Sequence, residues 1–179
     1  MFMLKAAIID DGIDASQFKN VKSWVIKKDL SIENENIISV KDNHACTCLK
    51  IIQKYCDMSD VFWHSIKILN DDTKRGNIRQ FIEALSLCEQ LEVKIIHLSI
   101  GTRSYSDFNL IEKSIEALCD KGTIIIAAAC NEGTVAYPAC MNGVIGVKCD
   151  FSATDQQYLY NCNTCLLYTS PSPRDRSVS

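Results

Sequence analysis

Short apolar runs that end in turn residues alternate along this chain with longer segments in which apolar residues recur at helical spacing. A short apolar run bounded by turn formers is typical of a buried strand, and apolar residues three or four positions apart are typical of an amphipathic helix. The pattern predicts strands over residues 5–9, 22–26, 37–40, 61–69, 94–99, 123–128 and 143–147. It predicts helices over residues 45–55, 77–90 and 107–121.

The alternation of strands and helices indicates βαβ units, which build a mostly parallel sheet. Two of the predicted strands, in VKIIHLSI and GTIIIAAA, are almost continuously apolar. Such strands are buried on both faces of a sheet. We therefore expect an α/β fold of three layers, with a mostly parallel sheet and helices on both faces.

Residues 165–179 differ in character from the rest of the chain. The string CLLYTSPSPRDRSVS has no apolar period and holds two of the three prolines together with four serines. That composition predicts disorder. The string also resembles the translation of a common sequencing-library adaptor, so we expect residues 1–164 to be the N-terminal portion of one domain and residues 165–179 to be a non-native tail.

Composition limits the function classes. The chain has 179 residues, 47% of them hydrophobic and 23% charged, with a formal net charge of -3. These values are typical of a soluble globular domain, and without a dense basic run they do not favour a nucleic-acid partner. No apolar run approaches the length that crosses a bilayer. The N-terminus lacks the features of a signal peptide, so we expect a cytoplasmic protein without a membrane partner.

The ten cysteines are scattered among the predicted strands and helices. This distribution favours reduced thiols over disulfides. The pair Cys46 and Cys48 and the pair Cys162 and Cys165 have no second pair at zinc-site spacing. We therefore predict no metal site.

Polar residues that follow predicted strands are the candidates for chemistry, because the carboxyl ends of parallel strands meet at one edge of the sheet. Asp10 ends the first strand, His44 begins a helix, and Asn131 follows a strand of isoleucines and alanines. An acid beside a histidine can hold its ring in one tautomer, as a general base requires. His44 and Asn131 each have a simpler interpretation as well. His44 can be a solvated turn residue, and Asn131 can be a turn former.

Five segments then share one resemblance. AAIIDDGID, NHACTCLKII, VKIIHLSIG, GTIIIAAACNEG and YPACMNGVIGV resemble, in this order, five successive blocks of the subtilisin-like serine peptidases (the subtilases, peptidase family S8). The resemblance covers about residues 4–150. It implies a subtilisin-like fold that is incomplete at the C-terminus, and a serine endopeptidase acting on peptide or protein substrates. It implies no required cofactor, although calcium stabilises many relatives.

The resemblance also assigns roles by position. It places Asp10 and His44 at the aspartate and histidine of the catalytic triad, and Asn131 at the oxyanion-hole asparagine. It implies that Ser99, Ile100 and Gly101 pair with an extended substrate, a form of β-augmentation. Two further acids near the first strand, Asp11 and Asp14, are then expected to be turn and solvent residues.

The family's Gly-Thr-Ser block, which carries the nucleophile, is absent from the sequence, and Ser170 is followed by proline. We therefore expect this chain to be inactive, since loss of a triad member leaves little catalysis. One alternative is a catalytically inactive, peptide-binding relative of the same fold. A second alternative is a receiver-type signalling domain. In receiver domains, an acidic pair that follows the first strand, as Asp10 and Asp11 do here, binds magnesium.

Overall fold

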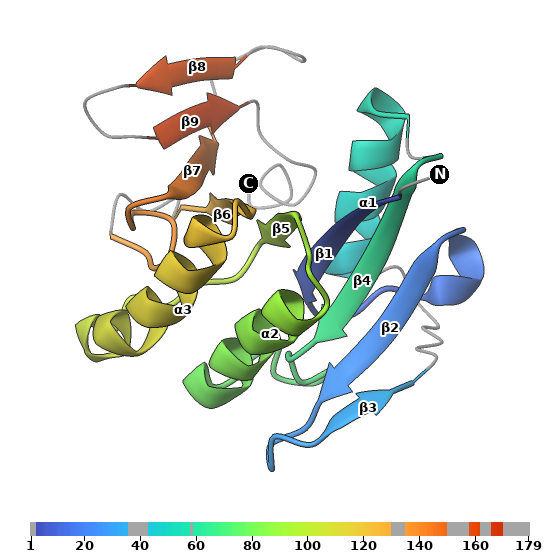
Figure 1. The fold of residues 1–179 in the computed structure, drawn as a ribbon, viewed down its shortest axis with the longest axis horizontal. Helices are drawn as coiled ribbons and strands as arrows, with labels where there is room; N and C mark the ends of the chain where they lie inside the picture. Colours follow the sequence, from blue (N-terminus) through green and yellow to red (C-terminus); the bar gives the residue numbers. More distant parts are fainter. Residues whose placement is uncertain are drawn as a thin grey trace.

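The computed structural model describes residues 3–35, 43–57, 59–129 and 135–149, together with the backbone of residues 158–161 and 166–169. A sheet of nine strands runs through the described chain in the order β3-β2-β4-β1-β5-β6-β7-β9-β8 (Figure 1). Neighbouring strands are parallel except in the pairs β2/β3 and β8/β9. The non-consecutive order reflects crossover connections, as βαβ units require.

The elements have the following bounds. The strands are β1 (Leu4–Asp10), β2 (Val21–Ile26), β3 (Ile32–Asn34), β4 (Val61–Lys67), β5 (Ile95–Leu98), β6 (Ile124–Ala128), β7 (Val144–Cys149), β8 (Tyr158–Asn161) and β9 (Leu166–Thr169). The helices are α1 (His44–Tyr55), α2 (Ile78–Gln90) and α3 (Phe108–Asp120), with short 3-10 turns η1 (Ala15–Gln17) and η2 (Tyr105–Asp107).

Strand β1 lies in the middle of the sheet and is buried on both faces. Because successive side chains of a strand point to opposite faces, Ala6 and Ile8 pack on one side and Ala7 and Ile9 on the other. The first pair contacts the apolar side of α1, and the second pair belongs to the larger cluster that α2 and α3 cover. The expected three-layer arrangement, with helices on both faces, is confirmed.

Capping residues set where two of the helices begin. The Asn43 side chain accepts a hydrogen bond from the Cys46 amide at 3.0 Å at the start of α1. At the start of α2, Asn77 and Gln80 form a reciprocal capping box. Each cap satisfies amide groups that a helix leaves unpaired in its first turn. The cap of α1 matters most here because His44 is the first residue of that helix.

The structure confirms most of the predicted elements to within about two residues at each end. The exception is the strand predicted over residues 37–40, which lies outside the described residues. The structure instead has strand β3 at Ile32–Asn34, antiparallel to β2, which the apolar pattern did not indicate because two of its three residues are polar. The cysteines at positions 48, 56, 88, 119 and 140 are free thiols, as predicted.

Part of the predicted tail is a strand. Strand β9 lies at Leu166–Thr169, parallel to β7 and within residues 165–179, for which we expected disorder. The segment Leu-Leu-Tyr-Thr consists of apolar, aromatic and β-branched residues, which suit a strand. The remaining tail residues lie outside the described chain, and a non-native origin of the tail stays a prediction.

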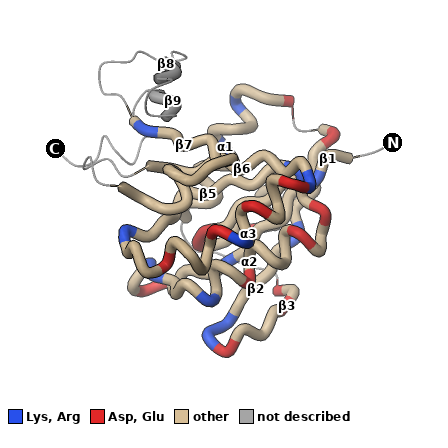
Figure 2. The backbone as a smooth tube through the Cα atoms, turned by 60° about the vertical axis from the view of Figure 1, so that its left-hand side comes forward, with Lys and Arg blue, Asp and Glu red and all other residues tan. Residues whose placement is uncertain are grey.

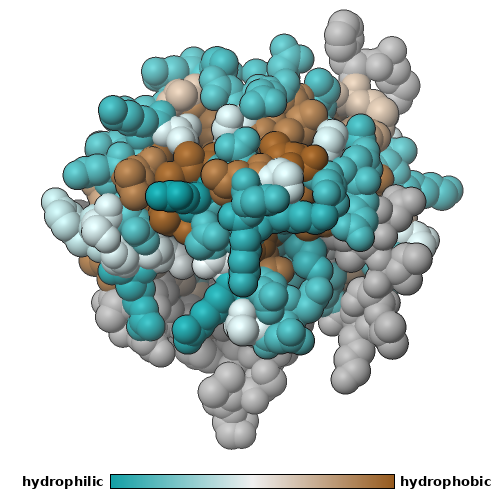
Figure 3. All heavy atoms as spheres, turned by 90° about the horizontal axis from the view of Figure 1, so that it is seen from below, coloured by the Kyte–Doolittle hydropathy of each residue, from teal (hydrophilic) through white to brown (hydrophobic). Residues whose placement is uncertain are grey.

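The surface of the described chain mixes both signs of charge. Figure 2 shows Lys and Arg interspersed with Asp and Glu along the outer helices and loops, while β5 and β6 carry no Lys, Arg, Asp or Glu. Seen from below in the orientation of Figure 1, a band of hydrophobic residues crosses the face between hydrophilic side chains (Figure 3). None of the helices in the described residues has the length and apolarity that crossing a membrane would require.

Candidate functional site

Three polar side chains meet at the carboxyl edge of the sheet. Asp10 is the last residue of β1, Ser99 directly follows β5, and His44 begins α1. Because β1 and β5 are neighbouring parallel strands, their carboxyl ends lie side by side. The structure therefore brings together two of the three residues that the sequence predicted for catalysis, and it adds Ser99 beside them.

The contact between Asp10 and His44 is short and well shielded. The Nδ1 atom of His44 lies 2.6 Å from Oδ2 of Asp10, whose side chain is only 2% exposed. The Ser99 hydroxyl donates to the same Oδ2 atom, and the Asp11 amide donates to Oδ1 at 2.8 Å. Both oxygens of the buried carboxylate are thus satisfied. Since Nδ1 is engaged, the Nε2 atom of His44 remains for a second partner.

The hydrogen bonds decide how the two groups titrate. Burial by itself would raise the pKa of the Asp10 carboxyl, but the bonds and charge of His44, with the donors Ser99 and Asp11, hold that pKa below its ordinary value. The pKa of His44 rises to about 10, first because of the bond to Asp10 and second because of the sulfur of Cys48. The contact therefore favours the charged pair, a carboxylate beside an imidazolium, over two neutral groups.

Cys48 is a neighbour of His44 for which the sequence predicted no role at this site. Its Sγ atom lies 3.7 Å from Nε2 and 3.9 Å from Nδ1 of His44. The sulfur is therefore close to both ring nitrogens. Although burial opposes ionisation, the neighbouring rings of His44 and His97 lower the pKa of the Cys48 thiol to about 7. The signal in the sequence is the spacing of four residues, which puts both side chains on one face of a helix.

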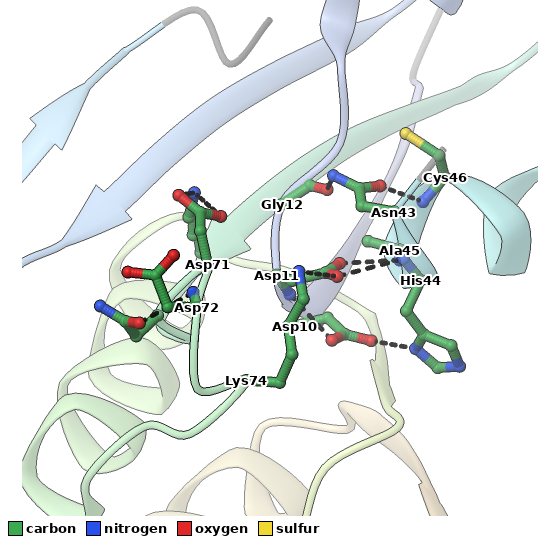
Figure 4. A network of polar contacts seen from close by, with 12 residues as sticks. Asp10, Asp11, Gly12, Asn43, His44, Ala45, Cys46, Asp71, Asp72 and Lys74 are labelled. Carbon is green, nitrogen blue, oxygen red and sulfur yellow. Dashed lines mark hydrogen bonds and ion pairs between the residues drawn. The ribbon is translucent and has the colours of Figure 1, made fainter. Parts of the chain in front are cut away.

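Asp11 and Asp14 are not solvent residues, which corrects our expectation. They are 3% and 4% exposed. The Asp11 carboxylate accepts the His44 amide at 3.1 Å and the Ala45 amide at 3.0 Å (Figure 4). Asp14 caps η1 through the Ser16 amide, so its predicted role in a turn is confirmed while its predicted exposure is wrong. Both acids are buried because they satisfy amides at the start of a helix.

A cleft of about 780 Å³ opens beside His44. Its lining includes Asp10, Lys74, Ile100 and Gly101. Within the part of the chain that the structure describes, the backbones of Ile100 and Gly101 form no hydrogen bond, whereas the next residue, Thr102, pairs with Tyr137. A Cβ atom at Gly101 would lie 2.8 Å from the Tyr137 carbonyl oxygen, so only glycine fits without displacement.

Other predicted residues are not placed. Asn131 lies outside the described residues, and so does Ser170. Over the ranges that are described, no group of three His, Cys, Asp or Glu side chains is arranged to hold a metal ion. The expectation that calcium is not required stays untested.

Comparison with known proteins identifies the same family as the sequence blocks. The sequence model described as "Subtilase family" matches residues 4–165. Among solved structures, Sphericase has a TM-score of 0.65 at 21% identity, with 80% of this chain and 52% of that chain covered. A cold adapted subtilisin-like serine proteinase has a TM-score of 0.66 at 17% identity, with 83% and 55% covered.

A lanthipeptide protease has a TM-score of 0.63 at 16% identity, with 80% of this chain and 47% of that chain covered. At these identities the likeness concerns the fold. The chain spans about half the length of these solved structures. A search of curated proteins finds no match.

Proposed function

This chain belongs to the subtilase family, and on that premise we propose that it is part of a serine endopeptidase in which Asp10 and His44 are two members of the catalytic triad. One observation carries the proposal, the 2.6 Å contact between Nδ1 of His44 and the buried Asp10 carboxylate. That contact would hold the imidazole in the tautomer whose Nε2 atom accepts a proton. Membership of the subtilase family excludes the alternative that the chain is a receiver-type signalling domain.

The proposed reaction assigns one task to each residue. A serine hydroxyl gives its proton to Nε2 of His44 as it attacks the peptide carbonyl, and His44 later returns a proton to the leaving amine. Asp10 stabilises the imidazolium between the two steps, and Asn131 donates a hydrogen bond to the oxyanion. Because the Gly-Thr-Ser block is absent from these 179 residues, we propose that the chain by itself does not hydrolyse peptides.

The proposed substrate is an extended peptide or protein segment. The backbones of Ile100 and Gly101, which form no hydrogen bond to other described residues, line the cleft beside His44 and can pair with such a segment. A related fold belongs to a lanthipeptide protease, which favours a peptide precursor as one substrate class. The free thiols support the proposed cytoplasmic location, because reduced cysteines persist in reducing compartments.

A second candidate is a catalytically inactive, peptide-binding member of the family. The cleft favours it, because the cleft and the backbones of Ile100 and Gly101, which form no hydrogen bond within the described residues, could bind a peptide without a serine. The two candidates differ in the gene beyond the codon for Thr164. A Gly-Thr-Ser block encoded there supports the peptidase, and an intact stop codon supports the binding protein.

A fluorophosphonate probe tests the peptidase directly, since it labels an activated serine. We expect a longer chain that includes the Gly-Thr-Ser block to be labelled, and the same chain carrying His44→Ala to lose labelling. The 179-residue chain should remain unlabelled. A longer chain that folds but resists the probe would overturn the peptidase assignment, and labelling of the 179-residue chain would refute its proposed inactivity.

A further inference from the structure

Asp11 is a buried carboxylate to which the proposed reaction gives no task. It follows Asp10, and successive residues at the end of a strand direct their side chains to different sides. Figure 4 shows the result, with Asp10 directed to the imidazole of His44 and Asp11 directed to the backbone amides at the start of α1. Two consecutive carboxylates therefore hold the same histidine, one by its ring and one by its main chain.

Asp11 accepts hydrogen bonds from the first two backbone amides of α1. Asn43, the cap of the helix, satisfies the Cys46 amide with its side chain and the Thr47 amide with its carbonyl oxygen. The two earlier amides, of His44 and Ala45, donate to Asp11. A carboxylate also has a favourable interaction with the positive end of the helix dipole. Since Asp11 belongs to the segment after β1, these bonds fasten the start of the helix to the edge of the sheet.

Lys74 reaches the same carboxylate from the wall of the cleft. Its Nζ atom lies 3.2 Å from Oδ2 of Asp11, the oxygen that also accepts the His44 amide. The lysine side chain is about half exposed and belongs to the loop between β4 and α2. The backbone φ of Lys74 is 50°, in the left-handed region, which residues other than glycine adopt at an energetic cost. A hydrogen bond of 2.9 Å from the Lys74 amide to the Asn70 carbonyl closes the loop.

We propose that Asp11 is a positioning residue for His44, and that Lys74, by binding Asp11, couples the loop on the cleft wall to the backbone of that histidine. The loop and His44 line one cleft, so a peptide that contacts Lys74 changes the charge balance at Asp11. The inference rests on the proposed function, because His44 is the proposed base.

Two substitutions in the 179-residue chain test this coupling. Asp11→Asn removes a negative charge and one of the acceptors, and Lys74→Met removes the positive charge while it keeps the length of the side chain. Asp72→Asn is the matched control, because Asp72 is an exposed acid of the same loop that has no contact with Asp11. The measurements are the titration of the His44 ring by NMR and the hydrogen exchange of the His44 and Ala45 amides.

The two variants should move the His44 pKa in opposite directions. Loss of the anion in Asp11→Asn should lower it by about half a unit, and loss of the cation in Lys74→Met should raise it by a similar amount. Exchange of the two amides should become about tenfold faster in Asp11→Asn, where a charged acceptor is lost, and stay close to wild type in Lys74→Met. The Asp72→Asn control should change neither quantity.

Shifts in the same direction would indicate general loosening and would overturn the proposal, as would two variants that behave like Asp72→Asn. If Asp11→Asn does not fold, Lys74→Met still decides, because it alters an exposed side chain and must raise the pKa. The proposed function fails separately. A longer chain that folds but resists the fluorophosphonate probe would refute the peptidase and leave these ring and amide measurements unchanged.

Discussion

The substitution Asp10→Asn tests the central contact of the site. It keeps the shape of the side chain while it removes the charge that faces Nδ1 of His44 at 2.6 Å. The pKa of His44 is raised from 6.5 to about 10, with the bond to Asp10 as the first cause. An opposite charge at this distance shifts a pKa by about one to three units. We therefore expect the His44 pKa to fall by about two units in Asp10→Asn.

The same shift predicts how stability depends on pH. A folded pKa above the unfolded value stabilises the fold fully below pH 6.5, and this stabilisation is lost as the pH rises through about 10. One pKa unit corresponds to about 1.4 kcal/mol, so a fall of about two units removes roughly 3 kcal/mol. The difference in unfolding free energy between wild type and Asp10→Asn should be largest below pH 6.5 and should shrink toward pH 10.

NMR of the histidine rings is the direct assay. The chain has three histidines, so the His44 signal can be assigned as the one that disappears in His44→Gln. Ser99→Ala is the matched control, because it removes the other side-chain donor to Asp10 without changing a charge. It should move the His44 pKa by a few tenths of a unit at most. A wild-type His44 that titrates near 6.5, or an Asp10→Asn variant in which it does not move, would refute the reasoning.

Three further predictions concern single groups. The Cys48 thiol has a pKa of about 7 because the neighbouring histidines outweigh burial, so its alkylation by iodoacetamide should have a midpoint near pH 7. The substitution His44→Gln should move that midpoint upward. Burial, with nearby lysines, lowers the pKa of His64 to about 4, so unfolding free energy should fall by roughly 3 kcal/mol between pH 6.5 and 4, and less in His64→Gln. Gly101→Ala should lower stability by about 1–3 kcal/mol in a thermal melt, because the new Cβ atom collides with the Tyr137 carbonyl.

Each of these predictions has a contrary result. An alkylation midpoint at Cys48 that does not respond to His44→Gln would mean that the ring has no influence on the thiol. Equal acid sensitivity of wild type and His64→Gln would assign the loss of stability to other groups. Wild-type stability of Gly101→Ala would show that the segment after β5 can move away from Tyr137.

The sequence predicted those parts of the fold that depend on local pattern. Strands β1 and β6 could be predicted because burial on both faces requires an apolar run. Helices α2 and α3 could be predicted because burial of one side requires apolar residues at helical spacing. Strand β3 has no such apolar pattern in its sequence. Its residues Ile-Glu-Asn are held at the sheet edge by pairing with β2, a contact that arises only after the chain folds back.

The site divides in the same way. Asp10 and His44 could be predicted because each stands at the end of a recognisable element. The burial of Asp11 could not, because an acid in a turn resembles a solvent residue until the start of α1 packs against it. Cys48 was counted among core thiols, although its spacing of four residues from His44 on a predicted helix already puts both side chains on one face.

The geometry of the acid and base pair follows from three adjacent elements. Asp10 ends β1, His44 begins α1, and Ser99 follows β5, and these elements pack directly on one another through the ladder of β1 and β5 and the apolar contacts between β1 and α1. The donors to the Asp10 carboxylate come from the same three places. The orientation of His44 is therefore established without any group from the missing nucleophile block. In the proposed reaction, a serine placed near Nε2 of His44 would therefore meet a ring that is already oriented, and preorganised groups need no rearrangement as the reaction proceeds.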